Sequence, residues 1–410
     1  MRPTAILALA VCFLPPPVSG QAAPQPRARD LGVPFDGTPG PLNAITDVAG
    51  VTVGQVTIVS GKGPLVVGQG PVRTGITAVL PRGAANGDPV MAGWFTLNGN
   101  GEMTGTTWLE ESGFLSGPVM ITNTHSVGVV RDAVIEWLVH KGFNFDWSLP
   151  VVAETWDGSL NDINGFHVSK QDAFRALDSA KTGPVAEGNI GGGTGMICHQ
   201  FKGGIGTASR RFAIEDKPYT LGVLVQCNYG VRRLLRIAGV PVGTEIPDLL
   251  PCLDTAEPRP NADERYPRCT AKVGARDPGP GGVGEMGSII VVVATDVPLL
   301  PHQLQRVARH VSLAIGKMGG LGSNSSGDIY VAFSTANPGA ADAKGLHAAT
   351  YIANEAITTV FEATVQATEE SITNALVAAE TMTGANDLRV SALPHDRLRA
   401  ALQKYNRLAK

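Results

Sequence analysis

The residues best suited to chemistry lie at the junction of Gly287 and Ser288, where a glycine-rich segment (residues 281–287) meets a run of apolar residues. Glycines allow backbone angles at which a hydroxyl can attack the preceding carbonyl. Cleavage there would make Ser288 an N-terminal residue, with its hydroxyl beside an α-amine whose ordinary pKa is about 8. Such an amine is partly neutral and can accept the hydroxyl proton. The junction therefore predicts a self-cleaving chain with Ser288 as its nucleophile, and a plain loop-to-strand junction is the alternative.

Further polar groups follow in the loop 322–328 (Gly-Ser-Asn-Ser-Ser-Gly-Asp), which precedes another apolar strand pattern. If the two strands are neighbours, Ser326 would hydrogen-bond the α-amine or the hydroxyl of Ser288, and Asp328 would orient the amine or stabilise its charge. Asn228, at the end of a third strand pattern, offers an amide N–H to a developing oxyanion. The alternative is that these residues form ordinary polar turns with local backbone bonds.

Alternation of apolar and polar residues predicts the elements that must position these groups. Strands are expected at 43–60, 74–80, 90–97, 119–124, 151–154, 219–226, 288–295 and 328–334. Helices are expected at 108–112, 127–141, 171–179, 302–318 and 393–408, with two more within 346–382. Strands that precede and interleave with helices predict an α+β fold in which helices pack on stacked sheets.

The composition limits the class of protein. The chain has 410 residues, 43% of them apolar, which is enough for a substantial core. A net charge of -3 without a Lys/Arg stripe argues against nucleic acid as a partner. A basic residue followed by an apolar stretch and small residues predicts a secretory signal over 1–22, and hence a periplasmic or secreted protein. Beyond it we expect a flexible leader over 23–30 and a single catalytic domain over 31–410, without a membrane-spanning run.

The cysteines fall into two groups. Cys252 and Cys269 lie in a proline- and charge-rich loop insertion, residues 251–280, and in an oxidising compartment they can pair. Cys198 and Cys227 lie among apolar or glycine residues, which favours buried thiols. The cysteine spacing does not resemble a zinc site, and no metal or organic cofactor is expected.

Several segments occur together in the order typical of one enzyme family. Between about residues 31 and 382 the chain resembles the self-processing β-aminopeptidase and L-aminopeptidase/D-esterase family. The resemblance rests on Leu97-Asn98-Gly99-Asn100-Gly101-Glu102-Met103-Thr104-Gly105, Thr122-Asn123-Thr124-His125-Ser126-Val127-Gly128, Glu154-Thr155-Trp156-Asp157-Gly158, Leu160-Asn161-Asp162-Ile163-Asn164-Gly165, residues 191–196, Val225-Gln226-Cys227-Asn228-Tyr229-Gly230, Gly287-Ser288 and Ser326-Gly327-Asp328.

The resemblance implies a four-layer αββα sandwich of the N-terminal-nucleophile hydrolase type and a homo-oligomer of cleaved chain pairs. By matching motif positions, Ser288 would be the nucleophile, with Ser326 and Asp328 as supporting groups and Asn228 as oxyanion donor. Trp156 stands where some relatives have a tyrosine, whose hydroxyl can help at the oxyanion. Without that hydroxyl, Trp156 is expected to shape the substrate pocket.

The resemblance also implies a substrate with a free N-terminal ammonium, which needs an anionic or carbonyl partner. Glu154, Asp157 and Asp162 are the candidates, and the alternative is that they are solvated turn acids. Substrates would be small peptides or amino acyl amides and esters. The choice among β-amino acyl, small L-amino acyl and D-alanyl groups stays open, as does the choice between the α-amine and a Ser326 relay as general base.

Other functions remain as alternatives. His125 would suit a Ser-His-acid triad, although a histidine that opens a helix usually caps or packs. An uncleaved, exported binding protein would keep the fold without the activity. An ornithine acetyltransferase has a related fold and self-cleavage, but enzymes of that class typically expose threonine and work in the cytoplasm, whereas this chain has Ser288 and a predicted signal.

Overall fold

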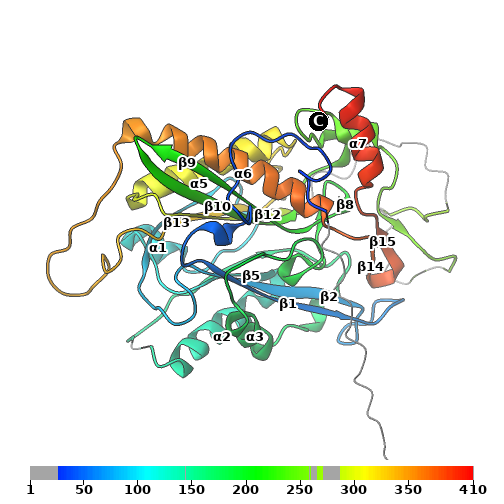
Figure 1. Ribbon diagram of the computed structural model, residues 1–410. Helices are drawn as coiled ribbons and strands as arrows, with labels where there is room; N and C mark the ends of the chain where they lie inside the picture. The colour runs from blue at the N-terminus through cyan, green and yellow to red at the C-terminus, as the bar shows by residue number, and fades with distance from the viewer. Residues whose placement is uncertain (1–25, 144, 258, 260–265, 271–286, 410) are drawn as a thin grey trace, which may run out of the picture.

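The computed structural model describes residues 26–143, 145–257, 259, 266–270 and 287–409. Its elements form four layers, with two helices above two stacked sheets and two helices below (Figure 1). The upper helices are α5 (Pro301–Lys317) and α6 (Thr358–Val377), and the lower helices are α2 (Val127–His140) and α3 (Lys170–Asp178). The expected α+β fold with an αββα arrangement is therefore confirmed.

The upper sheet has six strands in the order β4-β3-β13-β12-β10-β9. Their bounds are Phe114–Leu115 for β4, Val90–Thr96 for β3, Asp328–Ser334 for β13, Ser288–Thr295 for β12, Lys217–Asn228 for β10 and Gly204–Ile214 for β9. Every residue of β12 and β13 is buried, because these central strands are covered on both faces. This explains why their sequences are nearly continuous apolar runs instead of alternating patterns.

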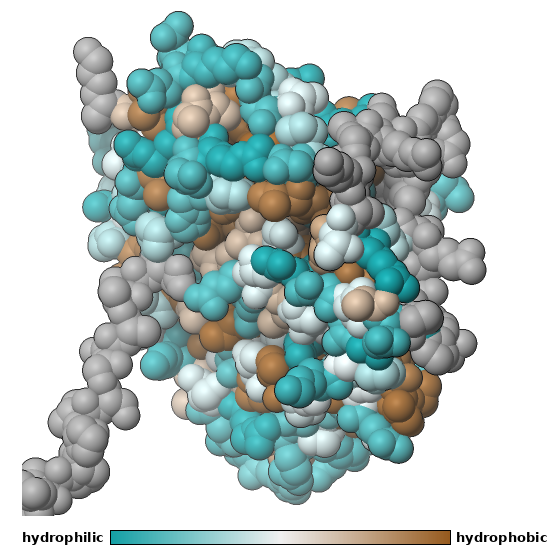
Figure 2. Space-filling view, turned by 90° about the vertical axis from the view of Figure 1, so that its right-hand side faces the viewer, coloured by the Kyte–Doolittle hydropathy of each residue, from teal (hydrophilic) through white to brown (hydrophobic). Residues whose placement is uncertain are grey.

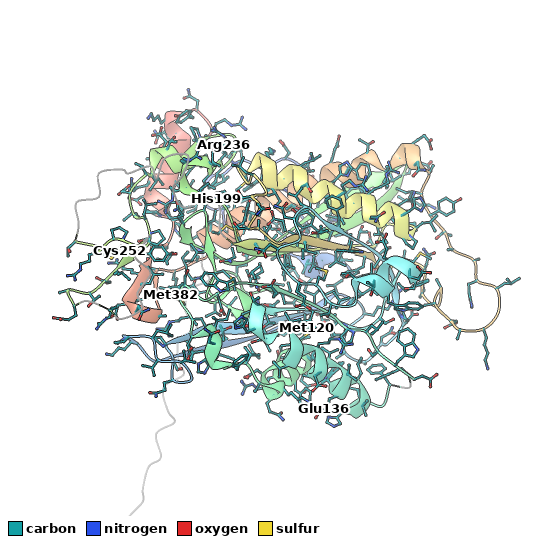
Figure 3. The ribbon with its side chains drawn as sticks, turned by 180° about the vertical axis from the view of Figure 1, so that it is seen from behind. Met120, Glu136, His199, Arg236, Cys252 and Met382 are labelled. Atoms are coloured by element: carbon teal, nitrogen blue, oxygen red, sulfur yellow. A yellow bond between two sulfur atoms is a disulfide. The ribbon has the colours of Figure 1, made fainter. Side chains whose placement is uncertain are left out.

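The lower sheet has four strands in the order β1-β2-β5-β6. They run over Thr52–Ser60, Val72–Leu80, Val119–Asn123 and Val151–Thr155. Ile121 and Ala153 of this sheet share one apolar cluster with Ile290 and Val331 of the upper sheet, so this cluster is the core between the sheets. Met120 faces the other way, into the layer where the lower sheet meets α2, as Figure 3 shows from behind.

The remaining elements are short. They are α1 (Thr106–Ser112), α4 (Val242–Glu245), α7 (His395–Lys404), β7 (Ile197–Cys198), β8 (Phe201–Lys202), β11 (Cys252–Leu253), β14 (Met382–Thr383) and β15 (Leu388–Val390), with 3-10 turns at Ile45–Asp47, Thr124–Ser126, Ile163–Gly165, Gly191–Gly193, Arg232–Leu234, Asn354–Ala356 and Ala385–Asp387. The side of the molecule that carries β14 and β15 is mostly hydrophilic, and apolar residues gather in a recess between its upper and lower halves (Figure 2). In the described part of the chain, no helix is long and apolar enough to cross a membrane.

Three sequence-based assignments of regular structure are wrong. A strand was expected over 43–60, but β1 begins at Thr52, and Ile45–Asp47 form a 3-10 turn before it. Of the two helices expected within 346–382 only α6 forms, and Leu346 before it is fully exposed at 104% relative accessibility. Ile352 and Ile357 reach the core, but residues 346–351 are exposed, so a helix there would lack a continuous apolar face to bury. Strand β9 was not predicted, because its glycines obscured the alternation of apolar and polar residues. Gly206 is required by packing, since a Cβ added there would lie 2.0 Å from the carbonyl oxygen of Ser371 in α6.

The leader expected to be flexible over 23–30 is ordered where the structure describes it. Arg27 pairs with Glu187 at 2.7 Å, and Arg29 pairs with the fully buried Glu370 at the same distance. The backbone N–H of Ala28 donates to Asn374 of α6 at 3.0 Å. These contacts offset the entropy lost on ordering, so this part of the expectation was wrong. The signal predicted over 1–22 and the glycine-rich residues 281–286 lie outside the described residues.

Both cysteine pairs form disulfides. Cys252 and Cys269 are joined with their Cα atoms 4.9 Å apart. This disulfide connects two described stretches of the insertion, residues 251–257 and 266–270. Cys198 and Cys227 are also joined, with a Cα separation of 5.6 Å, so the expectation of buried thiols was wrong. β7 lies against the end of β10, and this tertiary contact places two cysteines that are 29 residues apart within bonding distance.

Candidate active site

The site is built by three adjacent strands of the upper sheet. Antiparallel pairing of β10 with β12 sets Asn228 opposite Ser288, and parallel pairing of β12 with β13 sets Asp328 opposite Ile289. The three polar residues therefore meet at one edge of the sheet, where β12 and β13 begin and β10 ends. All are buried, with relative exposures of 4% for Asn228, 5% for Ser288 and 0% for Asp328.

The Ser288 hydroxyl is held by the loop that precedes β13. Its oxygen accepts a hydrogen bond from the backbone N–H of Gly327 at 3.0 Å. Ser326 donates its hydroxyl to Oδ1 of Asp328 at 2.6 Å, and the N–H of Ile289 donates to the same oxygen at 3.3 Å. Asp328 thus links the loop of residues 322–327, called the serine loop below, to the backbone immediately after Ser288. This contact agrees with the predicted orienting role without testing it.

A second loop, which follows β3, supports the serine loop. The side-chain amides of Asn98 and Asn100 donate to the carbonyls of Ser323 and Ser325 at 3.0 and 2.9 Å. Gly327 lies so close to this loop that an added Cβ would be 2.5 Å from the carbonyl oxygen of Asn100. This support was not assigned from the sequence, although the Asn-Gly-Asn-Gly motif was noticed.

Gly287 passes directly over Asn228. An added Cβ on Gly287 would be 1.9 Å from the carbonyl oxygen of Asn228, and Gly287 has a φ of 118°. Both facts require glycine on the N-terminal side of the predicted cleavage bond. The bond between Gly287 and Ser288 is therefore held next to the amide that was expected to act as oxyanion donor.

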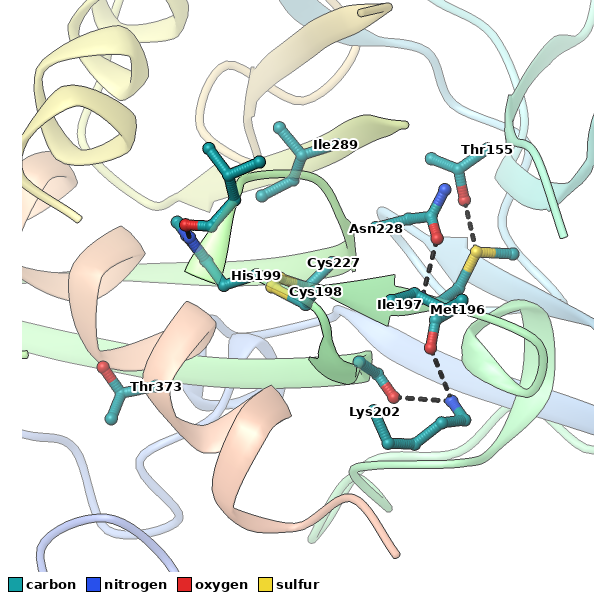
Figure 4. Close-up of a disulfide and its surroundings, with 12 residues drawn as sticks. Thr155, Met196, Ile197, Cys198, His199, Lys202, Cys227, Asn228, Ile289 and Thr373 are labelled. Atoms are coloured by element: carbon teal, nitrogen blue, oxygen red, sulfur yellow. Dashed lines mark hydrogen bonds between the residues drawn. A yellow bond between two sulfur atoms is a disulfide. The ribbon is translucent and has the colours of Figure 1, made fainter. Parts of the chain in front are cut away.

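Asn228 is fixed at both ends of its side-chain amide. Its Oδ1 accepts from the N–H of Ile197 at 2.7 Å, as Figure 4 shows. Its Nδ2 donates to the carbonyl of Trp156 at 3.0 Å. An amide nitrogen carries two hydrogens, so this geometry leaves one further donor. The orientation suits an oxyanion donor, and Trp156 contributes to it through its backbone.

Glu154 is the predicted acid that lies nearest the serine loop. It is 3% exposed, and it accepts hydrogen bonds from the N–H of Glu102 at 2.9 Å and from the hydroxyl of Thr124. An added Cβ on Gly101 would be 3.2 Å from Oε1 of Glu154 and 3.1 Å from Cα of Gly327, so one glycine separates them. Burial raises the pKa of Glu154 above its ordinary value, against the lowering effect of these hydrogen bonds.

Asp157 and Asp162 are used inside the fold. Asp157 is fully buried and accepts from the side-chain amides of Asn123 and Asn161 at 3.1 and 3.0 Å, and burial raises its pKa to about 6. Oδ2 of Asp162 accepts from the N–H of Gly68 at 2.7 Å and lies 2.8 Å from Nε2 of His167. Because both carboxylates are bonded within the fold, these contacts support neither substrate binding nor the alternative that the residues are solvated turn acids. Among the three acids, we keep only Glu154 as a candidate for binding the substrate's ammonium.

Trp156 and His125 lie at more open positions. Trp156 is 38% exposed and packs against Gly158, which agrees with a pocket-shaping side chain without testing that prediction. His125 is exposed and stacks on Phe166 with ring centroids 6.0 Å apart. The recorded partner of the Ser288 hydroxyl is the N–H of Gly327, so the geometry does not favour the triad alternative.

The described residues contain no group of three or more His, Cys, Asp or Glu arranged to hold a metal ion. The arrangement can bring together a serine hydroxyl, an oxyanion donor and a buried carboxylate. Such a set suits acyl transfer from an amide or ester to the serine.

Comparison with known proteins decides the family. The model of peptidase family S58 matches residues 43–390. The chain belongs to peptidase family S58. It is a hydrolase of the serine aminopeptidase class, and its fold is that of the N-terminal-nucleophile hydrolases.

Individual proteins of this kind match this S58 protein over nearly its whole length. Beta-peptidyl aminopeptidase BapA of Sphingosinicella microcystinivorans is 56% identical over 95% of this chain and 94% of the relative. The protein of the same name from Sphingosinicella xenopeptidilytica is 47% identical over 91% of this chain and 90% of the relative. The solved L-aminopeptidase D-Ala-esterase/amidase of Ochrobactrum anthropi, described as a variant of the Ntn hydrolase fold, matches with a TM-score of 0.82 and 46% identity, covering 94% of this chain and all of its own.

Proposed function

We propose that the chain cuts itself between Gly287 and Ser288 and that the mature enzyme releases N-terminal amino acids through an acyl-enzyme on Ser288. The observation that carries this proposal is the register of β10 and β12, which sets the amide of Asn228 beside Ser288. The nucleophile thereby has an oxyanion donor on a rigid neighbouring strand.

In the proposed reaction, Oγ of Ser288 attacks the carbonyl of the substrate's first residue and the hydroxyl proton passes to a base. The leaving amine takes up a proton, and water then hydrolyses the ester. The base is either the new α-amine of Ser288 or Ser326. Ser326 donates to Oδ1 of Asp328, and the same oxygen accepts from the N–H of Ile289, the residue after Ser288. The acid therefore contacts one candidate base directly and the residue next to the other.

Glu154 is proposed to bind the substrate's ammonium. Its carboxylate is buried, and a cation brought beside it would gain more from a charge pair than it would at the surface. The cation would also lower the pKa of Glu154, which burial raises, and so favour the ionised form. Of the acids considered, it alone is one glycine away from the serine loop.

Among substrate classes, β-amino acyl peptides are proposed first, because a relative named as a β-peptidyl aminopeptidase is 56% identical over nearly the full chain. Small L-amino acyl amides and D-alanyl amides or esters come next, on the printed description of the Ochrobactrum anthropi enzyme. Export to the periplasm or beyond is supported by the predicted signal over 1–22 and agrees with two disulfides. A homo-oligomer of cleaved pairs is proposed from the family resemblance alone.

The decisive experiment compares the wild type with Ser288→Ala and with Ser112→Ala, a half-buried serine at the end of α1 whose hydroxyl donates to the carbonyl of Trp108. Gel electrophoresis and N-terminal sequencing should find two fragments, the smaller beginning at Ser288, in the wild type and in Ser112→Ala. Ser288→Ala should remain one inactive chain. Active wild-type enzyme with an intact chain would refute the proposal and favour a different nucleophile.

A further inference from the structure

A buried lysine that the reaction above does not use lies behind the proposed oxyanion donor. Lys202, on β8, has a relative exposure of 0%. Its Nζ donates to the carbonyls of Met196 and Gly203 at 2.8 Å each, and to that of Gly193 at 3.3 Å. An ammonium removed from water is costly unless its donors are satisfied, and here these three carbonyl oxygens satisfy them.

One of these carbonyls belongs to the same peptide group as the N–H that holds Asn228. Lys202 binds the oxygen of Met196, and the nitrogen of the Met196–Ile197 peptide donates to Oδ1 of Asn228 at 2.7 Å. Figure 4 shows Lys202, Met196, Ile197 and Asn228 in this order. The path from the ammonium to the side-chain amide therefore consists of two hydrogen bonds joined by one planar peptide.

We propose that Lys202 is a positioning residue for the oxyanion donor, acting through the Met196–Ile197 peptide to orient and polarise the amide of Asn228. The proposal rests on the proposed function of Asn228. A positive charge at one end of a hydrogen-bond chain strengthens each following donor. The Asn228 amide is thereby held with its N–H₂ toward Trp156 and the reacting carbonyl, and it is a stronger donor than an isolated amide.

One further observation supports this assignment. The disulfide between Cys198 and Cys227 joins the residue after Ile197 to the residue before Asn228, so the backbone is fixed on both sides of their hydrogen bond. Burial lowers the pKa of Lys202 to about 7, so the lysine is charged below that pH and the polarising effect belongs to this ammonium form.

The test separates the charge of Lys202 from its volume and its donors. Lys202→Gln keeps two N–H donors without the charge, and Lys202→Arg keeps the charge in a larger side chain. With kinetics expressed per cleaved chain on an amino acyl anilide, we expect Lys202→Gln to lower kcat about tenfold and to change KM less than about twofold. We expect Lys202→Arg to retain more activity than Lys202→Gln, whereas a purely structural role would make the larger side chain the more damaging.

A double-mutant cycle identifies the route of the effect. If Lys202 acts through Asn228, then Lys202→Gln in an Asn228→Ala background should lower kcat less than about twofold further. An equal loss in both backgrounds, or a change confined to KM, would overturn the proposal. If Lys202→Gln does not give folded, cleaved protein, the same cycle is carried out with Lys202→Arg. A loss of kcat that is as large in the Asn228→Ala background as in the wild type contradicts the proposed route. A loss that disappears in the Asn228→Ala background supports it.

Arg232→Gln provides the matched control. Arg232 is also a buried cation held by backbone carbonyls, those of His199, Gln200 and Ile246, and it has no recorded bond to the Met196–Ile197 peptide among the described residues. We expect a lower Tm with kcat within about twofold of the wild type. Activity in Ser288→Ala would defeat the proposed function itself, and an unchanged kcat in Asn228→Ala would defeat the oxyanion assignment. Additive effects of Lys202 and Asn228 would defeat the present inference alone.

Discussion

Gly327 donates its backbone N–H to the hydroxyl oxygen of Ser288, and the two residues belong to neighbouring strand ends that are 39 positions apart in the chain. The contact fixes the nucleophile from the side of the serine loop, while Asn228 lies on the opposite neighbouring strand. The hydroxyl is thus placed by backbone geometry, and small changes to that backbone should be costly.

Replacement of Gly327 tests this placement. In Gly327→Ala the new methyl would lie 2.5 Å from the carbonyl oxygen of Asn100 and 2.7 Å from Cα of Gly101, so the loop must move away from Ser288. We expect slower self-cleavage and a kcat at least about tenfold lower per cleaved chain, as is usual when a reacting group is displaced by about 1 Å. Gly99→Ala is the control, because an added Cβ there meets nothing within 4 Å. Equal activity of both variants would contradict the placement.

Glu154→Gln tests ammonium recognition. Glutamine keeps an oxygen that can accept from the N–H of Glu102, so we expect cleavage to continue while KM for a substrate with a free N-terminus rises at least about tenfold. In the wild type, burial raises the pKa of Glu154, so protonation at acid pH should remove the charge and raise KM as pH falls. Initial rates across pH measure both effects. If KM still rises at low pH in Glu154→Gln, the protonation that raises KM belongs to another group.

Asp157→Asn distinguishes a structural carboxylate from a substrate-binding one. Burial raises the Asp157 pKa from 3.8 to about 6, so the folded protein binds a proton more tightly than the unfolded chain. Stability from this group is therefore present at low pH and is lost as pH rises from about 4 to about 6. We expect Asp157→Asn to flatten the pH dependence of Tm in this range and to leave KM within about twofold. A large rise in KM would restore Asp157 as a substrate ligand.

Both disulfides lie on the N-terminal side of the proposed cleavage bond, since their cysteines are Cys198, Cys227, Cys252 and Cys269. We therefore expect the two fragments to separate on a gel without reductant. Under denaturing conditions these cysteines should resist alkylation until reductant is added, as mass spectrometry can measure. Replacement of Cys198 and Cys227 by alanine should cost about 3 kcal/mol, because their disulfide closes a loop with a sequence separation of 29. Alkylation of Cys198 in untreated protein would show a free thiol instead.

Much of the fold follows from local pattern. The apolar run after Ser288 and the alternation in residues 74–80 specify strands because side-chain period and burial are linked at short range. Residues 346–357 were wrongly expected to be helical because only Ile352 and Ile357 reach the core, and these two residues do not form a continuous apolar helix face. Ser288, Ser326, Asp328 and Asn228 were predicted from the sequence because each stands at or next to a strand end, where polar residues interrupt apolar runs, and the structure brings these residues together.

Which side chains share the site depended on strand pairing. Glu154 and Asp157 are three positions apart in one motif, yet the first lies beside the serine loop and the second is enclosed by Asn123 and Asn161. Cys198 meets Cys227, and Lys202 meets the peptide that holds Asn228, only because β7 and β8 fold back over the end of β10. Residue types and local patterns therefore specify the chemical groups and the elements that carry them. The partners of these groups follow from sheet order and strand register, which bring distant segments together and which local spacing does not encode.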